Sequence, residues 1–585
     1  MAEGMARHRA SVIPRRAGAL PALIPLLFTG ALFVAPLAAL VVRAYADADA
    51  VAPLEAWRRT GALELLGITV GQAAASAVLA VLVAAPIVWL VSTVDVPGMR
   101  VLRVIVTLPF VLPTVVVGVA FRALGSGLYD GLGLESGLGA VLMAHVFLNV
   151  AVVVRVVSAV WQQIDPSAVA AARTLGASPG RAFADVVLPR LLPAAAAAAA
   201  LVFLFCSTSF GVIVILGDGR VRTLETEIYQ QGVGYFRIPE AVALSFLQVL
   251  LVVAALILAR LLGRGTPPAV GDRGGRRRRP RGAEWIPVVG VVGWAVWWLV
   301  VPIGSLVLRS LRPAGRWSFD GYRLLFSGAD AGVDVVASLR YSVTGALAAM
   351  VIAVAVGLLA ATATMRRRDL VSRVGAALAV LPLGISAVTL GFGYVVLMTW
   401  LPREVGTSPL LIPSVQALIA IPVVIGMIVP ALAEVPARRR DAAAVLGAGP
   451  LRVFWTVDLP MIARSLCAAA GFAFVMAIGE FGATTFLAQP NTTTLPVLIG
   501  SLMGRPGADN LAAAMAASVL LVLVSAVVIF LVELAEPGRR RDDRPESDSA
   551  DRAGPGPDLD ARSGRVLADR AESRSLRRRT DRRSG

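Results

Sequence analysis

Few polar side chains interrupt the long apolar stretches of this chain, and they mark where ligand chemistry could occur. His145 and Asn149 lie four residues apart in the run 138–160, so they share one face if that run is helical. Glu480 lies deep in another apolar run, at 464–487. Polar groups inside a membrane span are costly and usually face the bundle interior or a water-filled pathway. We interpret these residues as lining for a transported ligand and assign no catalytic residues.

Glu480 has two interpretations, which the sequence leaves open. A charged group at the centre of a span costs about 2.5–3.5 kcal/mol on insertion scales, so the carboxylate should face a pathway or find a partner. In the first interpretation it lines the outer mouth of the pathway and favours a cationic cargo. In the second it caps a local turn together with Gly479 and Gly482.

Several other chemistries are excluded by residues that the chain lacks or misplaces. It contains no lysine, and a Walker A loop needs its lysine on the nucleotide phosphates, so we expect no ATP hydrolysis by this polypeptide. Cys206 and Cys467 both lie in apolar runs and support neither a disulfide nor a metal site. We predict no cofactor. The net charge of +17 resides in arginines of short loops and the tail, which favours a role in topology over nucleic-acid binding.

The composition identifies a polytopic membrane protein. Hydrophobic residues make up 57% of the 585 residues, and the mean hydropathy is +0.76. A helical span needs about 20 apolar residues to cross roughly 30 Å of hydrocarbon. About twelve stretches meet that requirement, which predicts an all-α fold.

A long repeat organises these stretches. The segment AAARTLGASPGRAFADVVLP, from Ala170 to Pro189, has a second copy in DAAAVLGAGPLRVFWTVDLP, from Asp441 to Pro460, 271 residues later. Each copy predicts a short helix, a Gly-Ala turn and a second helix ended by Leu-Pro, because glycine adopts turn angles that other residues avoid. A single copy could be an ordinary packed helical turn. Two copies in arginine-bearing loops indicate two equivalent docking surfaces.

The repeat resembles the EAA motif, the cytoplasmic coupling loop of permease subunits of binding-protein-dependent ABC importers. In that family the loop fits a cleft of an ATPase subunit and transmits its closing motion. Ala170 and Asp441 stand where the family has glutamate, so an acidic contact is lost from the first copy and shortened in the second. The resemblance implies coupling roles for Ala171, Ala172, Gly176, Ala177, Phe183 and Pro189, and for Asp441, Ala442, Ala443, Gly447, Ala448, Phe454 and Pro460.

The repeat extends into the spans. Leu108-Pro109 and Gly118 match Leu381-Pro382 and Gly391 at an offset of 273, and Ser209-Phe210-Gly211 matches Glu480-Phe481-Gly482 at 271. Prolines break the helical hydrogen-bond ladder, which membranes tolerate beside a pathway or where neighbouring helices satisfy the freed groups. A kinked pore helix and a mere packing irregularity both fit. The expected pathway residues are Pro109, Pro113, His145, Asn149, Ser209, Phe210, Pro382, Glu480 and Phe481.

The chain is expected to divide into two tandem six-helix halves. The first half, 1–262, has spans near 20–42, 65–91, 101–121, 138–160, 194–216 and 241–262, with a coupling loop at about 161–193. A Pro, Gly and Arg-rich stretch, 263–284, indicates a flexible cytoplasmic linker. The second half, 285–535, has spans near 285–308, 341–364, 374–398, 411–432, 464–487 and 511–534, with a coupling loop at about 433–464. The Arg-rich tail, 536–585, is expected to be disordered and cytoplasmic.

Arginine placement agrees with this topology, because the loops expected in the cytoplasm are richer in arginine than those outside. Both coupling loops then lie on the cytoplasmic side of the cell membrane, as do both chain ends. A fused pair of halves is similar to the thiamine and ferric-iron permease branch of the family. AHVFLN from Ala144, SFGVIVILGDG from Ser209 and RTLETEIYQ from Arg222 resemble thiamine permeases.

The resemblance implies a type I ABC importer fold that forms the pathway for thiamine or ferric iron. Its implied partners are two copies of an ATPase subunit on the cytoplasmic face and an extracytoplasmic substrate-binding protein, within the lipid bilayer. The alternative is an ion-coupled secondary transporter, which also uses twelve spans and repeats. That alternative predicts repeated charged residues inside spans, and Glu480 and Arg155 stand nearly alone. It also gives no reason for the paired loops.

Overall fold

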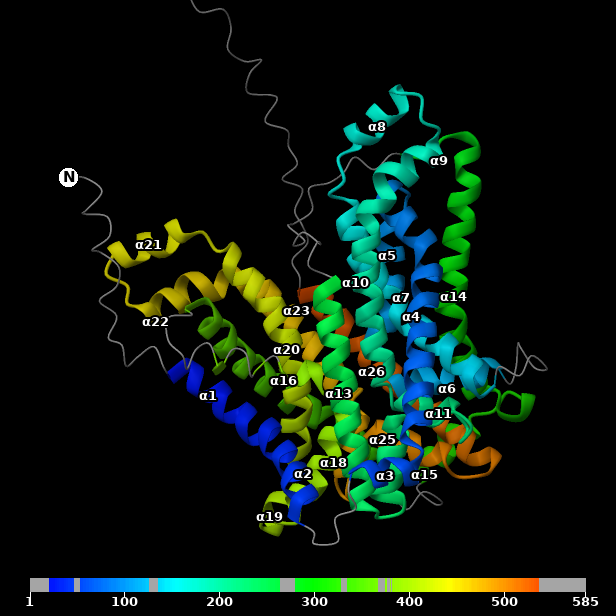
Figure 1. Ribbon diagram of the computed structural model, residues 1–585, viewed down its shortest axis with the longest axis vertical. Coiled ribbons are helices and arrows are strands. Elements are labelled where there is room, and N and C mark those ends of the chain that lie inside the picture. Colours follow the sequence, from blue (N-terminus) through cyan, green and yellow to red (C-terminus); the bar gives the residue numbers. More distant parts are fainter. Residues whose placement is uncertain are drawn as a thin grey trace, which may run out of the picture. The chain divides into compact units, whose positions relative to one another are not determined.

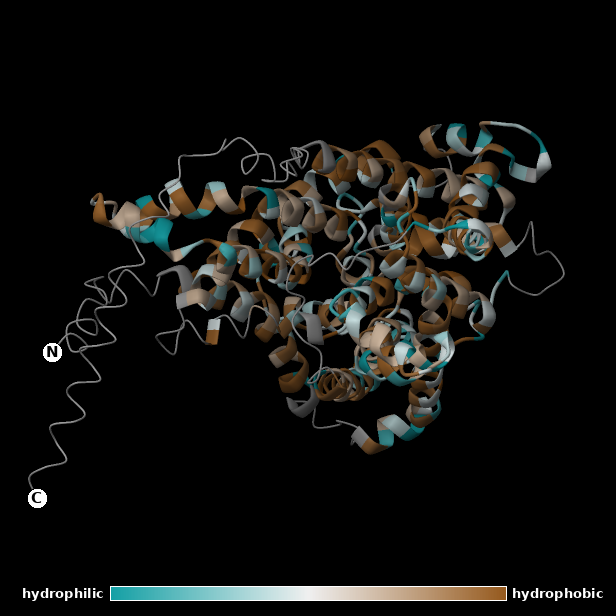
Figure 2. Cartoon of the chain, turned by 90° about the horizontal axis from the view of Figure 1, so that it is seen from above, coloured by the Kyte–Doolittle hydropathy of each residue, from teal (hydrophilic) through white to brown (hydrophobic). Residues whose placement is uncertain are grey.

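The computed structural model describes residues 20–46, 53–125, 135–262, 279–327, 334–366, 374–375, 379 and 381–535. Every element assigned within these ranges is a helix or a helical turn (Figure 1). Most of the expected linker at 263–284 and the whole tail at 536–585 lie outside the described residues. Hydrophobic residues predominate along the helices, as the hydropathy colouring of Figure 2 shows.

For brevity, described residues up to Leu262 are called the first half and those from Arg279 the second half. The helices of the first half are α1 (Leu20–Thr29), α2 (Ala35–Ala46), α3 (Pro53–Thr60), α4 (Ala62–Thr93), α5 (Met99–Val111), α6 (Thr114–Gly125), α7 (Leu138–Trp161), α8 (Pro166–Thr174), α9 (Pro179–Ala182), α10 (Leu188–Ser207), α11 (Gly211–Leu216), α12 (Leu224–Tyr229) and α13 (Ile238–Leu262). A π-helical turn, Gly30–Val34, joins α1 to α2, and others occupy Phe183–Val187 and Gln230–Gly234.

The second half repeats much of this order. Its helices are α14 (Trp285–Leu311), α15 (Asp320–Ser327), α16 (Val335–Arg366), α18 (Ala387–Met398), α19 (Arg403–Gly406), α20 (Leu411–Glu434), α21 (Ala437–Val445), α22 (Pro450–Val453), α23 (Leu459–Ile478), α24 (Gly482–Leu487), α25 (Leu495–Met503) and α26 (Ala508–Ala535). Short 3₁₀ turns occupy Gly282–Glu284, Pro313–Gly315 and Leu381–Gly384. A π-helical turn at Phe454–Asp458 falls at the position equivalent to Phe183–Val187.

Ten helices in the described ranges are long and apolar enough to cross a membrane, or eleven if the bent pair α5 and α6 counts as one span. The expectation was about twelve. The difference lies at 374–398, where the described helix α18 has only 12 residues and part of the preceding segment is outside the described residues. The chain is a multi-pass membrane protein, as its composition predicted.

Three of the expected spans are interrupted. The run 101–121 bends by 104° between α5 and α6, where Pro113 follows Leu112 and offers no backbone N–H to continue the helix. The runs 194–216 and 464–487 were expected to be continuous, and this was wrong. Helix α10 ends at Ser207 before α11 begins, and α23 ends at Ile478 before α24 begins. Of the two prolines expected to break the run 101–121, Pro113 lies at the bend, whereas Pro109 lies inside α5.

The two halves exchange their first spanning helices. Helices α1 and α2 pack against α16 and α18 of the second half, whereas α14 of the second half packs against α4, α5 and α6 (Figure 1). Hydrogen bonds accompany the exchange, because Tyr394 Oη donates to Leu32 O at 2.5 Å and Ser305 Oγ donates to Ala120 O at 3.4 Å. Each half therefore completes its packing only with a helix of the other.

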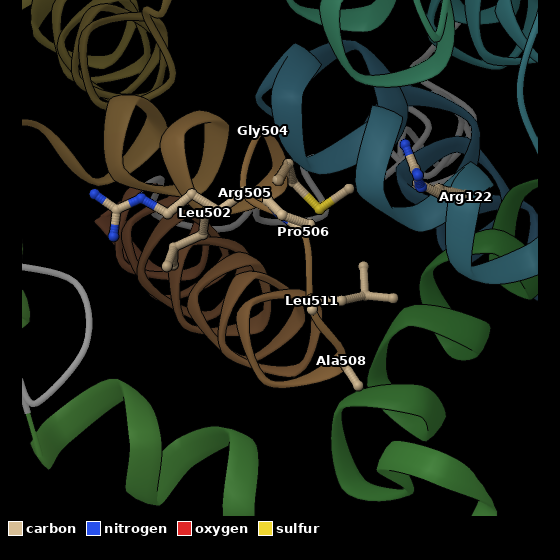
Figure 3. Close-up of a pocket in the computed structure, with 9 residues that line it drawn as sticks. Arg122, Leu502, Gly504, Arg505, Pro506, Ala508 and Leu511 are labelled. Atoms are coloured by element: carbon tan, nitrogen blue, oxygen red, sulfur yellow. The ribbon is translucent and has the colours of Figure 1, made fainter.

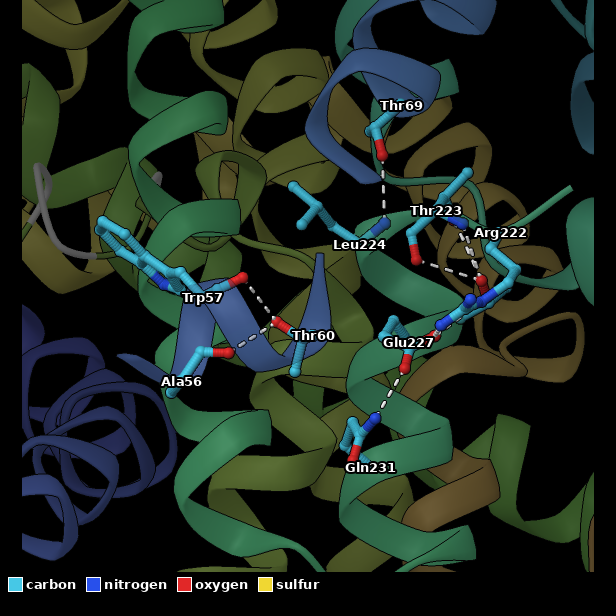
Figure 4. Close-up of polar contacts among 10 residues, drawn as sticks. Ala56, Trp57, Thr60, Thr69, Arg222, Thr223, Leu224, Glu227 and Gln231 are labelled. Atoms are coloured by element: carbon cyan, nitrogen blue, oxygen red, sulfur yellow. Dashed lines mark hydrogen bonds and ion pairs between the residues drawn. The ribbon is translucent and has the colours of Figure 1, made fainter. Parts of the chain in front are cut away.

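Equivalent hydroxyl groups hold the short helices α12 and α25 in the two halves. Thr69 Oγ1 on α4 accepts a bond of 3.0 Å from Leu224 N, the first residue of α12 (Figure 4). Ser342 Oγ on α16 accepts a bond of 2.7 Å from Leu495 N, the first residue of α25. In both cases a buried side chain satisfies a helix N-terminus that has no intrahelical partner.

Helix α12 is also held by polar side chains, and the corresponding residues of α25 are of other types. Arg222 Nη2 lies 2.7 Å from Glu227 Oε2, and Gln231 Nε2 donates to Glu227 Oε1 at 2.7 Å (Figure 4). The hydrogen bond that Arg222 donates to Glu227 raises the pKa of the Arg222 guanidinium above its ordinary value. The segment 222–231 is therefore held as a fixed structure outside the spanning helices.

Candidate functional site

The two repeated loops have the same turn. Gly176 and Gly447 have φ values of 91° and 83°, in the left-handed region that favours glycine. Ala177 N donates to Ala172 O at 3.1 Å, and Ala448 N donates to Ala443 O at 3.0 Å. These bonds satisfy carbonyl groups at the ends of α8 and α21. The turn predicted from the Gly-Ala pairs is present in both copies.

Both loops expose leucine just before the glycine. Leu175 is 89% exposed and Leu446 is 88% exposed, although residues of this type are normally buried. The expected loop residues lie around them: Ala171 and Ala172 on α8, Asp441, Ala442 and Ala443 on α21, Phe183 and Phe454 in the equivalent π-helical turns, and Pro189 and Pro460 near the starts of α10 and α23. The loops thus present apolar side chains on a surface that nothing in the described chain covers.

The two loops are not equal in their side chains. The second loop also exposes Val445, Leu451 and Trp455, where the first loop has Thr174, Gly180 and Ala184. It is also braced by an ion pair of 2.7 Å between Arg440 Nε and Asp458 Oδ1.

A cavity of about 360 Å³ lies where the interrupted helices of the two halves meet. Its first-half wall comes from the α5–α6 break, from α7 and from the α10–α11 break. Its second-half wall comes from the start of α18, from α20 and α23, and from the α23–α24 break. Discontinuous spanning helices commonly form ligand sites in transporters, because their freed backbone groups need a polar or ligand partner.

Seven of the nine expected pathway residues line this cavity: Pro113, His145, Asn149, Ser209, Phe210, Glu480 and Phe481. The other two, Pro109 in α5 and Pro382 in the 3₁₀ turn before α18, are buried but are not among the lining residues. The structure therefore brings together residues from both halves that are far apart in the sequence.

Glu480 makes a local cap, as the second of its two interpretations expects, and it also lines the cavity. Its Oε1 accepts a bond of 2.8 Å from Ala483 N, and its Oε2 accepts one of 2.9 Å from Thr484 N. The carboxylate thereby caps α24. The same side chain lines the cavity. The backbone of Gly482 and the side chain of Thr484 also contact the carboxylate, so it is held firmly at the cavity wall.

The polar face of α7 is largely held in place by the first half. His145 Nδ1 lies 3.3 Å from Ser76 Oγ on α4, and Asn149 Nδ2 donates to His145 O at 2.8 Å. Asn149 Nδ2 also lies 3.6 Å from Cys206 Sγ on α10. These contacts fix both side chains at the cavity wall.

The sequence did not single out the phenylalanines of this cavity. Phe110, Phe205 and Phe472 join Phe210 and Phe481 in its lining. The chain has 20 phenylalanines, and nothing in their spacing separates these three from the rest. The exposed leucines of the loops were also missed, although Leu175 and Leu446 occupy matching places in the repeat and could have been found there.

A second cavity, of about 450 Å³, lies at the segment 502–511 and α6. Among the residues that line this cavity, Arg122 comes from the first half and the others come from the second. Figure 3 shows Arg122 and Arg505 on opposite sides of the cavity. Arg122 Nη1 donates to Ile215 O at 3.2 Å. Its charged lining is cationic, so this cavity suits a cationic ligand less well than the one beside Glu480.

Comparisons with known proteins agree with this architecture. The family described as "binding-protein-dependent transport system inner membrane component" matches residues 76–266 and again 353–541. The thiamine transport system permease protein ThiP of Brucella abortus is 28% identical over 452 residues, which is 74% of this chain and 81% of ThiP. A probable ABC transporter permease protein, y4fN of Sinorhizobium fredii, is 26% identical over 525 residues, covering 84% and 90%. The molybdenum transport system permease protein ModB of Mycobacterium bovis is 33% identical over 211 residues, covering 34% and 78%.

Proposed function

The chain belongs to the binding-protein-dependent transport system inner membrane component family, and on this premise we propose that it forms the path by which an ATP-driven importer carries thiamine across the cell membrane. It is a permease subunit of an ABC importer. The proposal that the importer is driven by a separate ATPase rests on one observation. It is the pair of matched loops, with their exposed leucines before Gly176 and Gly447.

The loops are the docking points for two copies of an ATPase subunit. Burying an exposed leucine side chain is favourable by roughly 1.5–3 kcal/mol. A partner with an apolar cleft that covers this leucine would therefore bind more tightly. In this proposal the coupling segments are about 161–193 and 433–464. The absence of lysine from the chain agrees with ATP hydrolysis by a separate subunit.

The proposed topology places both loops and both chain ends in the cytoplasm, because arginine is concentrated in the segments assigned to that side. The first half then corresponds to 1–262 and the second to 285–535, joined by the linker 263–284 and followed by the tail 536–585. A substrate-binding protein outside the cell delivers the cargo to the opposite face.

Thiamine is the proposed cargo on two grounds. The relatives reported above include a fused thiamine permease whose length is 81% covered. The cavity also offers a carboxylate and several aromatic rings, which suit an aromatic cation. Neither ground specifically favours ferric iron. The molybdenum permease matches only 34% of the chain and carries less weight for the cargo.

In the proposed cycle, the ATPase subunits close on ATP and pull the loops together. The halves then rock about the cavity, which opens to the binding protein, and the cavity opens inward after hydrolysis. The exchange of α1–α2 and α14 makes each half move partly with the other's helix. An ion-coupled transporter would have no use for the paired loops.

The test is reconstitution of the permease with its ATPase in liposomes, with thiamine-loaded binding protein added on the outer side. We expect ATP-dependent thiamine uptake. Exchanging both leucines (Leu175→Ser with Leu446→Ser) should lower ATPase binding at least tenfold and abolish stimulated hydrolysis.

Leu63→Ser is the matched control, because Leu63 is a similarly exposed leucine on α4, outside the loops. It should leave uptake unchanged. Full uptake by the double loop variant would refute the docking role. Uptake that follows a proton or sodium gradient without ATP would refute the whole proposal.

A further inference from the structure

The cavity wall of the first half contains two polar atoms that have no hydrogen-bond partner within the described residues. They are His145 Nε2 and Ser209 Oγ. Both residues line the cavity, and His145 is only 1% exposed. A buried polar group without a partner costs about 1–3 kcal/mol, so such groups in a native structure usually await a ligand or water.

His145 is held in a fixed orientation while one nitrogen stays available. Ser76 Oγ occupies Nδ1, which leaves Nε2 as the other polar atom of the ring. Ser209 lies at the break between α10 and α11. In the second half the equivalent residue is Glu480, whose carboxylate caps the next helix, whereas the Ser209 hydroxyl caps nothing in the part of the chain that is described.

The opposite wall carries the charge. The Glu480 carboxylate lines this wall, and no arginine is among the lining residues. Phe110 and Phe205 on one side and Phe472 on the other make the remaining wall largely aromatic. A cation against such rings gains about 0.5–2 kcal/mol, more as water is excluded.

We propose that this cavity is a cargo-binding site within the path, selective for an aromatic organic cation that also carries a hydrogen-bonding group. Glu480 supplies the counter-charge from the second half. His145 Nε2 and Ser209 Oγ supply directional hydrogen bonds from the first half. This inference rests on the proposed function, since it gives the permease itself a part in selecting the cargo that the binding protein delivers.

The arrangement explains why the polar atoms are distributed over both halves. A cargo that contacts Glu480 on one side and His145 or Ser209 on the other can bind both walls only when the halves are close together. When the halves rock apart, one set of contacts is lost. The site would therefore hold the cargo in one state of the cycle and release it in the next.

The experiment measures equilibrium binding of radiolabelled thiamine to the purified permease–ATPase complex without binding protein. The competitor is the neutral thiophene isostere of thiamine, which has the same shape and no quaternary nitrogen. We expect saturable thiamine binding and a preference for the cation of about tenfold, as for one charge contact in a site shielded from water.

Glu480→Gln should remove the preference for the cation. It should weaken the binding of thiamine about tenfold and the binding of the isostere less than about twofold. His145→Ala and Ser209→Ala should weaken both ligands by a similar factor, about three- to tenfold. Ser207→Ala is the matched control, because the Ser207 hydroxyl donates to Leu204 O three residues away and Ser207 does not line the cavity.

The outcomes separate this inference from the proposed function. If the wild-type complex transports thiamine but binds it without saturation, or with no preference over the isostere, the cargo site is refuted while the transport function stands. Unchanged binding in the His145 and Ser209 variants also refutes it. If wild-type liposomes show no uptake at all, the proposed function fails first. The Glu480→Gln variant could fold poorly because its cap is weakened. In that case the competition between thiamine and the isostere for the wild-type complex still tests whether the site prefers the cation.

Discussion

Phe210 and Phe481 stack on each other, with ring centroids 5.4 Å apart and an angle of 21° between the ring planes. They occupy equivalent positions in the repeat, 271 residues apart. In a two-fold arrangement a residue meets its own equivalent only close to the axis. The stack therefore marks where the axis that relates the two halves passes, at the lining of the cavity.

Removing the stack should open the path. Phe481→Ala deletes a ring that also contacts the α10–α11 break, and we expect passive thiamine flux in nucleotide-free liposomes to rise several-fold. Phe210→Ala should act in the same direction. An aromatic pair contributes about 0.5–1.5 kcal/mol beyond its buried area. Its loss should therefore shift the equilibrium measurably from a closed path toward an open one. Phe530→Ala, on the exposed face of α26, is the control, and equal flux in all three variants would contradict the role of the stack.

Ser386 joins the halves and begins a helix. Its hydroxyl accepts bonds from Val388 N and Thr389 N, which caps α18, and donates to Glu225 Oε2 of the first half at 2.5 Å. Glu225 is fully buried, and its other oxygen accepts a bond of 2.7 Å from Gln248.

Ser386→Ala should lower the stability of the protein by roughly 2–4 kcal/mol, because it removes a cap and leaves a buried carboxyl oxygen without its partner. Thermal unfolding of the purified protein measures this. The double variant Ser386→Ala with Glu225→Leu should be less destabilised than the sum of the single changes. Ser501→Ala, which loses one local bond to Leu498 O, is the control. A strictly additive double variant would count against the contact.

Two glycines at equivalent positions permit close helix contact. A Cβ at Gly118 would lie 2.8 Å from Ile215 Cβ, and a Cβ at Gly391 would lie 2.9 Å from Ala483 Cα. Either alanine variant should destabilise the protein by about 1–3 kcal/mol through overpacking. Gly391→Ala should be worse, because its neighbour is backbone. Gly426→Ala in α20, where no atom lies within 4 Å, should be neutral or stabilising in the same unfolding assay.

The sequence was enough to predict the repeat and the turns at Gly176 and Gly447, because each depends on local residue types. It marked Pro109 and Pro113 as helix breakers, but not which of the two lies at the bend. It could not show the breaks before Gly211 and Gly482. The residues there, Ser207 to Ser209 and Gly479-Glu480, are polar or small, but a polar residue in a span does not by itself interrupt a helix. The interruption depends on contacts with other helices, such as that of Gly211 with Thr114. The exchange of α1–α2 and α14 was missed for the same reason: apolar helices carry no local signal of which partner they pack against.

The second loop exposes more large apolar side chains than the first. Val445, Leu451 and Trp455 are exposed in the second loop, the latter two by 72% and 59%, where the first loop has Thr174, Gly180 and Ala184. Each large side chain covered by a partner contributes up to roughly 1.5–3 kcal/mol. If both loops bind the same ATPase subunit, the second should bind it more tightly.

A reciprocal exchange tests this in nanodiscs by titration with the ATPase subunit. Wild-type permease should show two binding steps whose dissociation constants differ by at least tenfold. Val445→Thr, Leu451→Gly and Trp455→Ala together should remove the tight step and leave the weak one. Thr174→Val, Gly180→Leu and Ala184→Trp together should tighten the weak step, which a mere loss of folding cannot do. Two equal steps in the wild type would show instead that the extra apolar residues of the second loop stay outside the contact.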